Sequence, residues 1–295
     1  MWVESPPNQY PSPLAQAWGE YRRRPLQMAA LYILAAITLT ALVAPWLSPF
    51  DLDVQHRDQL LLPPAWEPGG SFRHFLGTDD LGRDMLSQLI LGSQATFGSA
   101  LLTVLLAATI GISIGVTAGM TRGIKSSVLH HLLDTTLSIP TLLLAVAAIA
   151  LFGVGLWPVL LAVLLSQIPQ FIRSTRAALV RELPKAYVTA ARLDGQGRAR
   201  LFFRTLLPNL LEPLGLQFCT SLATAILDIA ALGFLRLGAQ SPQPEWGAML
   251  SGGLEHLYHS PWMVALPGLA LLLTVLSVNV VGEGLRHALA KGAGR

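Results

Sequence analysis

The sequence predicts an all-α, polytopic membrane protein with six transmembrane helices. Apolar residues make up 52% of the 295 positions and charged residues only 13%, with a mean hydropathy of +0.52. Soluble domains are less apolar and carry more charge. Several apolar runs reach about 20 residues, which at ~1.5 Å per residue crosses a hydrocarbon core of ~30 Å. The charged residues gather between these runs, so composition and patterning agree.

The apolar runs and the basic residues between them predict a topology. The predicted spans are Met28–Leu47, Thr96–Met120, Leu132–Phe152, Val154–Ile172, Leu214–Leu235 and Trp262–Val281. The termini and the loops on their side hold 16 of the 20 Lys and Arg residues. Basic residues stay on the cytoplasmic side of a membrane, so both termini are predicted to be cytoplasmic.

This topology divides the chain into five segments. They are an N-terminal cytoplasmic segment (1–27), a first transmembrane helix (28–47), a periplasmic loop (48–95), a transmembrane core (96–284, with a cytoplasmic loop at 173–209) and a cytoplasmic tail (285–295).

Several functions find no support in the sequence. No Gly-Lys dipeptide occurs, so a phosphate-binding P-loop is not expected. The seven histidines are scattered and Cys219 is the single cysteine, so neither a metal site nor an intrachain disulfide is predicted. The basic residues flank apolar spans, which does not favour nucleic-acid binding. Without an acid pair or a nucleophile motif, a non-catalytic membrane protein is expected.

A basic segment, 173–209, separates the fourth and fifth predicted spans. It holds eight Lys or Arg residues and two acids. Pro184 is suited to the first turn of a short helix, and Gly195 is suited to a left-handed residue at its end. Tyr187, Ala190 and Ala191 would share one face, because residues three and four apart are neighbours on a helix. The segment predicts either a docking helix with an open small-residue face or an ordinary basic connector.

The order of residues in this segment resembles the EAA loop of bacterial ABC-importer permeases. The matching stretch runs from Ala190-Ala191 through Gly195 to Thr205-Leu206-Leu207-Pro208. In that family the loop is a coupling helix that docks into a groove of the ATPase subunit. Thr189 and Thr205 depart from the usual Glu and Ile. The resemblance implies a coupling role for six residues: Tyr187, Ala190, Ala191, Arg192, Gly195 and Pro208.

The end of the predicted periplasmic loop carries a second motif. Residues 74–84 read His-Phe-Leu-Gly-Thr-Asp-Asp-Leu-Gly-Arg-Asp, which resembles the LGTDxLGRD motif of the C-type permeases in the dipeptide/oligopeptide branch. The motif residues are Gly77, Thr78, Asp79, Gly82, Arg83 and Asp84. The two glycines permit tight turns. Thr78, Asp79 or Asp80 is expected to cap the following helix, and Arg83 to pair with Asp80 or Asp84.

A third motif follows the fifth predicted span. Residues 242–250 read Pro-Gln-Pro-Glu-Trp-Gly-Ala-Met-Leu and resemble the family's P-x-P-x-W-G-x-M-L segment, with Trp246 and Gly247 at its centre. Ile229, Gly233 and Arg236 differ from the residues usual in the general family. These differences resemble the Sap branch, which is associated with peptide transport or putrescine export.

Two membrane spans carry further patterns. Gln217, Ser221, Thr224 and Asp228 recur on one helical face, and an ionisable residue at membrane depth is a candidate functional residue. This face is predicted either to border a translocation pathway or to be structural, with Asp228 bonded inside the bundle or near the outer interface. Glycines recur every fourth residue from 111 to 119, a spacing that favours close helix contact, either within the chain or with a partner permease.

The resemblance implies a type I ABC-importer permease fold in the bacterial inner membrane. It implies four partners besides membrane lipid: a second permease, two ATPase subunits that use ATP and Mg, and a periplasmic binding protein. This chain itself would bind no cofactor. The resemblance makes peptide uptake the first expectation. Acids outnumber basic residues seven to three in 48–90, which would favour cationic peptides. Polyamine export and a stand-alone, ion-coupled secondary transporter using Asp228 are the alternatives.

Overall fold

The computed structural model describes residues 13–51, 58–120 and 140–292. Its regular structure is helical. The longer elements run Pro13–Arg22 (α1), Pro25–Leu47 (α2), Met85–Ser93 (α3), Ser99–Met120 (α4), Thr141–Phe152 (α6), Leu156–Glu182 (α7), Ala186–Leu193 (α8), Leu207–Phe234 (α10), Trp246–Gly253 (α11) and Trp262–Gly292 (α12). Short helical turns complete them: Gln94–Gly98 (η1), Arg198–Arg200 (α9), Leu201–Leu206 (η2) and Leu254–His256 (η3).

Five helical stretches in the described part are long and apolar enough to cross a bilayer. They are Pro25–Leu47, Met85–Met120, Leu156–Glu182, Leu201–Phe234 and Trp262–Ala290. A shorter apolar helix, α6, covers the second half of the predicted third span, whose first half lies outside the described residues. The predicted all-α, polytopic class is confirmed.

The helices are longer than the predicted spans. α12 continues to Gly292 and α7 to Glu182, each about ten residues beyond the apolar run. Apolar composition marks only the part of a helix that lies in hydrocarbon, whereas backbone hydrogen bonding continues into water. The N-terminal segment also contains a helix, α1, that the polar, proline-rich composition did not predict.

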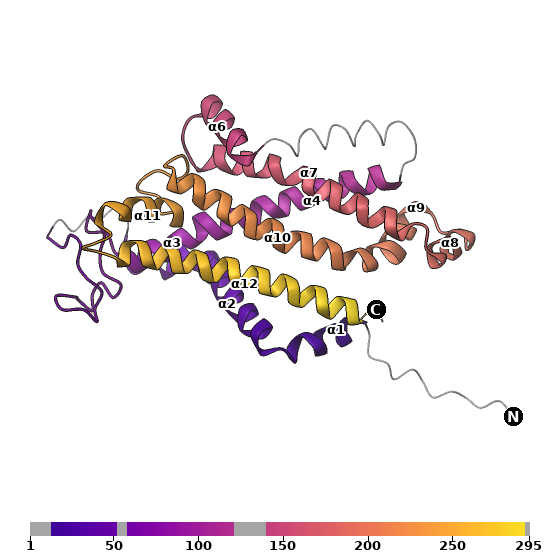
Figure 1. The fold of residues 1–295 in the computed structure, drawn as a ribbon, viewed down its shortest axis with the longest axis horizontal. Coiled ribbons are helices and arrows are strands. Elements are labelled where there is room, and N and C mark those ends of the chain that lie inside the picture. Colours follow the sequence, from indigo (N-terminus) through magenta and orange to yellow (C-terminus); the bar gives the residue numbers. More distant parts are fainter. Residues whose placement is uncertain (1–12, 52–57, 121–139, 293–295) are drawn as a thin grey trace.

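The long helices lie roughly along one axis, with different elements at the two ends (Figure 1). One end carries the segment that follows α2, together with α11, and is here called the loop end. The other end carries α8, α9 and the C-terminal turns of α12, and is here called the α8 end. α1 lies beside the last turns of α12. The predicted coupling loop and the predicted external motifs are therefore at opposite ends of the bundle.

A seam of three glycines joins α4 to α7. A Cβ atom at Gly111 would lie 2.5 Å from the Phe171 Cβ, and one at Gly115 would lie 2.7 Å from the Thr175 Cβ. Gly119 meets Leu179 in the same way, at 2.9 Å. Side chains at these positions would force the two helices apart. The glycine pattern therefore serves packing within the chain.

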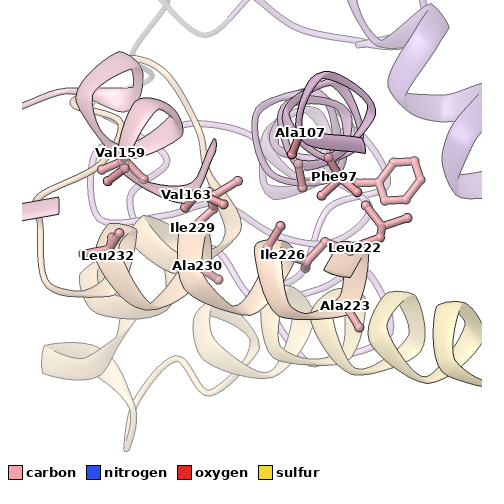
Figure 2. Close-up of a cluster of buried hydrophobic side chains, with 14 of the residues drawn as sticks. Phe97, Ala107, Val159, Val163, Leu222, Ala223, Ile226, Ile229, Ala230 and Leu232 are labelled. Atoms are coloured by element: carbon pink, nitrogen blue, oxygen red, sulfur yellow. The ribbon is translucent and has the colours of Figure 1, made fainter. Parts of the chain in front are cut away.

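The main core forms where α10 crosses α4 and α7. In Figure 2, Ile226 and Ile229 of α10 point toward Val163 of α7 and the α4 helix, while Ala223 and Ala230 point the other way. Many of the core residues are alanines, so the helix backbones approach closely.

Candidate coupling site

The candidate coupling helix, α8, is a separate short element between α7 and η2. It begins at Ala186, after a turn that contains Pro184, so the prediction that Pro184 occupies its first turn is wrong. Lys185 instead precedes the helix in an extended conformation. Gly195 has a φ of +75° and ends the helix as predicted, because glycine adopts the left-handed region without steric cost.

The two faces of α8 have different environments. Val188 and Ala191 are buried in a small core with Leu179, Leu201 and Leu206. The expectation that Ala191 shares an open face is therefore wrong: its methyl group packs against this chain.

The open surface of α8 lies on its other side. It consists of Tyr187, Thr189, Ala190, Arg192 and Leu193. The Leu193 side chain is 84% exposed at the end of the bundle, although it is a large apolar residue. The helix thus presents a mixed apolar and basic surface.

A buried acid joins α8 to the end of α7. Glu182, 6% exposed, accepts a hydrogen bond from the Tyr187 hydroxyl at 2.5 Å and forms an ion pair with the Lys185 ammonium at 2.5 Å. Both contacts are made by residues at the start of α8. Since Glu182 is the last residue of α7, the two helices are linked by side chains as well as by the turn between them.

The far end of the loop is closed by a second polar contact. The Thr205 hydroxyl donates to the Gln196 side chain at 3.2 Å, which joins η2 to the residues after α8. Pro208 occupies the first turn of α10, where its missing N–H costs no helical hydrogen bond. Arg192, Gly195 and Pro208 are not buried, so of the six predicted coupling residues only Ala191 is buried.

The predicted polar face of α10 is present and is partly covered. The Gln217 side chain donates to the Ser221 hydroxyl at 3.0 Å, and Ser221 is buried. Thr224 is exposed and donates to the Thr220 carbonyl. Asp228 meets Thr141 at the start of α6 through a side-chain hydrogen bond. Its Oδ2 atom is buried without a hydrogen-bond partner among the described residues.

The motif at residues 77–84 builds the loop that enters α3. Asp79 is buried and accepts hydrogen bonds from the backbone N–H groups of Leu81 and Arg83, from the Gln88 amide and from the Arg83 guanidinium, the last at 2.7 Å. Gly77 and Gly82 both have left-handed φ angles, as predicted.

Two expectations for this loop are wrong. Arg83 pairs with Asp79, not with Asp80 or Asp84. The cap of the following helix is Asp84, which accepts from the Ser87 N–H at 2.8 Å. Asp84 was expected only as a partner of Arg83, because the sequence does not show which of several nearby acceptors the folded loop turns toward the helix. Thr78, for its part, donates to the Gln59 carbonyl at 2.6 Å and accepts from the Leu62 N–H.

The third motif surrounds a buried acid, Glu245. Its carboxylate accepts from the Gly247 N–H at 2.9 Å, from the Ala248 N–H at 2.9 Å and from the Thr96 hydroxyl at 2.8 Å. Burial raises the pKa of Glu245, and these three hydrogen bonds oppose that effect. A Cβ at Gly233 would lie 1.8 Å from the Glu245 Oε2, so the glycine makes room for the carboxylate.

Trp246 and Gly247 fix α11 against two spans. The Trp246 indole donates to the Leu89 carbonyl at 3.1 Å and packs on Gly92 of α3. A Cβ at Gly247 would lie 1.9 Å from the Ala230 carbonyl oxygen of α10. Both motif residues are buried and structural.

A match to known protein families shows the family of this chain. Residues 111–295 match the model of the binding-protein-dependent transport system inner membrane component. This chain belongs to that family. Residues 12–64 match the N-terminal transmembrane domain of oligopeptide transport permease C, which makes the chain a permease of the C type.

Curated relatives match almost the whole permease. The di/tripeptide transport system permease protein DppC of Pseudomonas aeruginosa (strain UCBPP-PA14) is 44% identical over 95% of this chain and 92% of its own length. The peptide transport system permease protein SapC of Salmonella typhimurium (strain LT2) is 45% identical over 96% and 95%. The dipeptide transport system permease protein DppC of Escherichia coli (strain K12) is 45% identical over 94% and 93%.

A solved structure supports the fold of the permease. A chain of the MetNI methionine ABC transporter, in an inward-facing conformation, matches with a TM-score of 0.58 and 21% identity. The match extends over 70% of this chain and 97% of the MetNI chain. At this identity the likeness concerns the fold alone.

Two buried acids that position the elements of this site were not predicted from the sequence. Glu182 and Glu245 are buried acids that hold helix ends in this permease. Their only sequence signal is an acid placed within one or two residues of a helix end, which is common. Their partners Tyr187 and Thr96 become visible only in the fold.

Proposed function

We propose that this permease is the C-type membrane component of an ATP-driven peptide transporter. The observation that carries the proposal is the open surface of α8, which lies at one end of the bundle with an exposed leucine and an arginine while its other face is packed. A helix fixed in this way is suited to receive force from another protein. The three relatives described above, all named as di/tripeptide, dipeptide or peptide permeases, support peptides as the transported class.

The proposed assembly contains a second permease, two ATPase subunits and a periplasmic binding protein. ATP and Mg would be used by the ATPase subunits, and the lack of a P-loop in this chain supports that division. Closure of the ATPases would push on α8. The Glu182 contacts would pass that displacement to α7 and so to the membrane helices.

The α8 surface is tested by a pull-down from detergent-solubilised membranes of the native host, with ATPase subunits identified by mass spectrometry. Ala190→Glu/Leu193→Glu places two charges on the open surface and is expected to remove the ATPases. Thr189→Glu is the matched control: it adds a charge at an exposed neighbouring position where the family usually has Glu, and it is expected to retain them. Retention of the ATPases by Ala190→Glu/Leu193→Glu as well as by Thr189→Glu would refute docking at this surface.

The substrate class is tested with the purified complex in proteoliposomes. Peptide movement that requires ATP supports the proposal. Movement of putrescine without movement of peptides would favour the polyamine alternative. Movement driven by a proton gradient in the absence of ATPases would identify a secondary transporter instead.

The orientation of the chain is part of the same proposal, with the α8 end and both termini in the cytoplasm. The charge distribution supports it. In a Cys219→Ala background, Tyr258→Cys at the loop end should react with an impermeant thiol reagent in intact spheroplasts. Leu193→Cys should react only after the membrane is opened, and the reverse result would invert the topology.

We also propose that the polar face of α10 borders the translocation pathway. The exposed Thr224 and the unpaired oxygen of Asp228 support this, because polar groups at membrane depth usually face protein partners or water. The competing interpretation is that Asp228 holds α6 against α10 through Thr141.

A further inference from the structure

Helix α1 has a packed face that fixes its position. Ala17 and Tyr21 are buried against Ala288 of α12 and its neighbours. The Tyr21 hydroxyl donates to the Gln27 carbonyl at 3.1 Å, which ties α1 to the first turn of α2. A Cβ at Gly284 would lie 2.7 Å from the Tyr21 ring, so α12 approaches as closely as a glycine allows. α1 is therefore held in one place beside the end of α12 (Figure 1).

A half-exposed aromatic ring and a cation border the packed face of α1. Trp18 is 48% exposed, and the Arg22 guanidinium lies 5.6 Å from the centre of its ring. The Trp18 ring is also stacked on Tyr21, at 6.0 Å and 7°. Contacts of this kind orient both side chains toward the same surface.

Arg22 and the next two residues form a basic triplet. Arg23 pairs with Glu20 at 3.3 Å, whereas no carboxylate in the described part of the chain pairs with Arg22 or Arg24. All three are exposed. Trp18 and Arg22 together form an exposed surface, here called the α1 surface, whose positive charge no carboxylate of the described residues neutralises. Arg24 is two residues further on and lines a small cavity with Tyr21, Gln27 and Gly284.

The neighbour of this surface is a membrane span. α2 begins at Pro25, directly after the triplet, and only 17% of its most apolar window is buried in the chain. Leu26 and Tyr32 in its first turns are largely exposed. The apolar surface that continues from the α1 surface is therefore one that a bilayer would cover. Tryptophan is enriched at the boundary of hydrocarbon and headgroups, and basic residues there attract anionic lipids.

We propose that the α1 surface binds the headgroup of an anionic phospholipid in the leaflet at the α8 end. Arg22 contacts the lipid phosphate, and the Trp18 ring lies at the level of the acyl carbonyls. A lipid is favoured over a protein partner because the basic residues are continuous with the exposed apolar turns of α2. This proposal does not depend on the transported substrate or on the ATPases.

The test measures quenching of Trp18 by brominated lipids. The full chain is placed in phosphatidylcholine nanodiscs that contain equal fractions of either brominated phosphatidylglycerol or brominated phosphatidylcholine. Subtracting the signal of Trp18→Phe isolates Trp18 from the other six tryptophans. The brominated anionic lipid is expected to quench Trp18 at least about twofold more, since each basic residue near a membrane surface attracts anionic lipid.

Two variants complete the test. Arg22→Gln should abolish the preference, while Arg192→Gln, which removes the same charge elsewhere at the α8 end, should retain it. Equal quenching by the two lipids in the native chain would overturn the proposal. Absence of quenching by either lipid, with Trp18 accessible to iodide, would also overturn it and place this surface in water. If neither the brominated lipids nor iodide quenched Trp18, the result would indicate that protein covers this residue, and the lipid proposal would also be rejected.

Discussion

The Thr96 hydroxyl donates a hydrogen bond to the Glu245 carboxylate at 2.8 Å, across 149 positions of sequence. The same hydroxyl accepts the N–H of Trp246 at 3.0 Å. One threonine in a π-helical turn therefore satisfies both the first residue of α11 and the acid that caps it. This contact joins the first long span of the core to the segment after α10, and it makes the loop end a connected structure.

Replacing Glu245 by alanine should destabilise the permease. The variant leaves the buried N–H group of Gly247 and the partly buried N–H group of Ala248 without their acceptor, at a cost of up to about 1–3 kcal/mol for the buried group. Thermal unfolding in detergent should show a lower Tm. Glu255→Ala is the control, because its pair with Arg236 at 3.9 Å is exposed, and its Tm should not change. Equal Tm values for both variants would show that the cap contributes nothing.

The buried Glu245 should also make stability depend on pH. Burial raises the pKa of Glu245 above the ordinary 4.5. At a pH between 4.5 and this raised pKa, the folded chain keeps the proton of Glu245 while the unfolded chain has released it. Its stabilising contribution is complete below the ordinary pKa and declines as the pH rises through the raised pKa. The Tm of the native chain minus that of Glu245→Gln should therefore decrease with rising pH from about 4.5. A constant difference would contradict the inference.

The glycine seam predicts a packing penalty. Gly115→Val would place a Cβ 2.7 Å from the Thr175 Cβ and 3.0 Å from the Ile172 carbonyl oxygen, and the backbone oxygen cannot rotate away. Forced separation of α4 and α7 should cost about 1–3 kcal/mol or more. Gly252→Val, where nothing lies within 4 Å, is the control. Comparable yields and Tm values for the two variants would argue against the seam.

Glu182 and Tyr187 should behave as a coupled pair. Glu182→Gln and Tyr187→Phe each weaken the link between α7 and α8, and the double variant should cost less than the sum of the singles by about 0.5–1.5 kcal/mol. Hydrogen exchange should be faster in α8 of each variant and unchanged in α4. Strict additivity would mean that the two side chains act independently.

Asp228→Asn tests the proposed pathway. If the carboxylate contacts a cationic group of the cargo, losing its charge should weaken apparent affinity for peptides with a free amine by about tenfold or more. Thr141→Val, which removes only the hydrogen bond to Asp228, should leave that affinity closer to native. Unchanged affinity and rate in Asp228→Asn would leave Asp228 with a structural role.

The sequence predicted the all-α membrane class and the approximate positions of the five long helices in the described part of the chain, because apolar composition is a local signal. Gly77, Gly82 and Gly195 were also predicted to permit left-handed turns, which is a local property of glycine. The sequence did not predict which residue fills a position when several neighbouring residues of one type could fill it. Asp84 rather than Asp79 caps α3, since the loop turns Asp79 toward Arg83 and Gln88. Ala191 faces inward because η2 folds back over α8, and no periodicity within an eight-residue helix shows which side its neighbour will cover.

The glycine seam has a mechanical consequence for any change of conformation. α8 is joined by side chains to α7, α7 is in backbone-level contact with α4, and α4 is continuous with the helical turns that begin at Met85. At Gly111, Gly115 and Gly119 no side chain of α4 separates the two helices, so a shift of α7 acts directly on α4 there. A displacement applied at α8 should therefore reach the loop that contains Asp84, at the opposite end of the bundle, as a rigid-body movement of these helices.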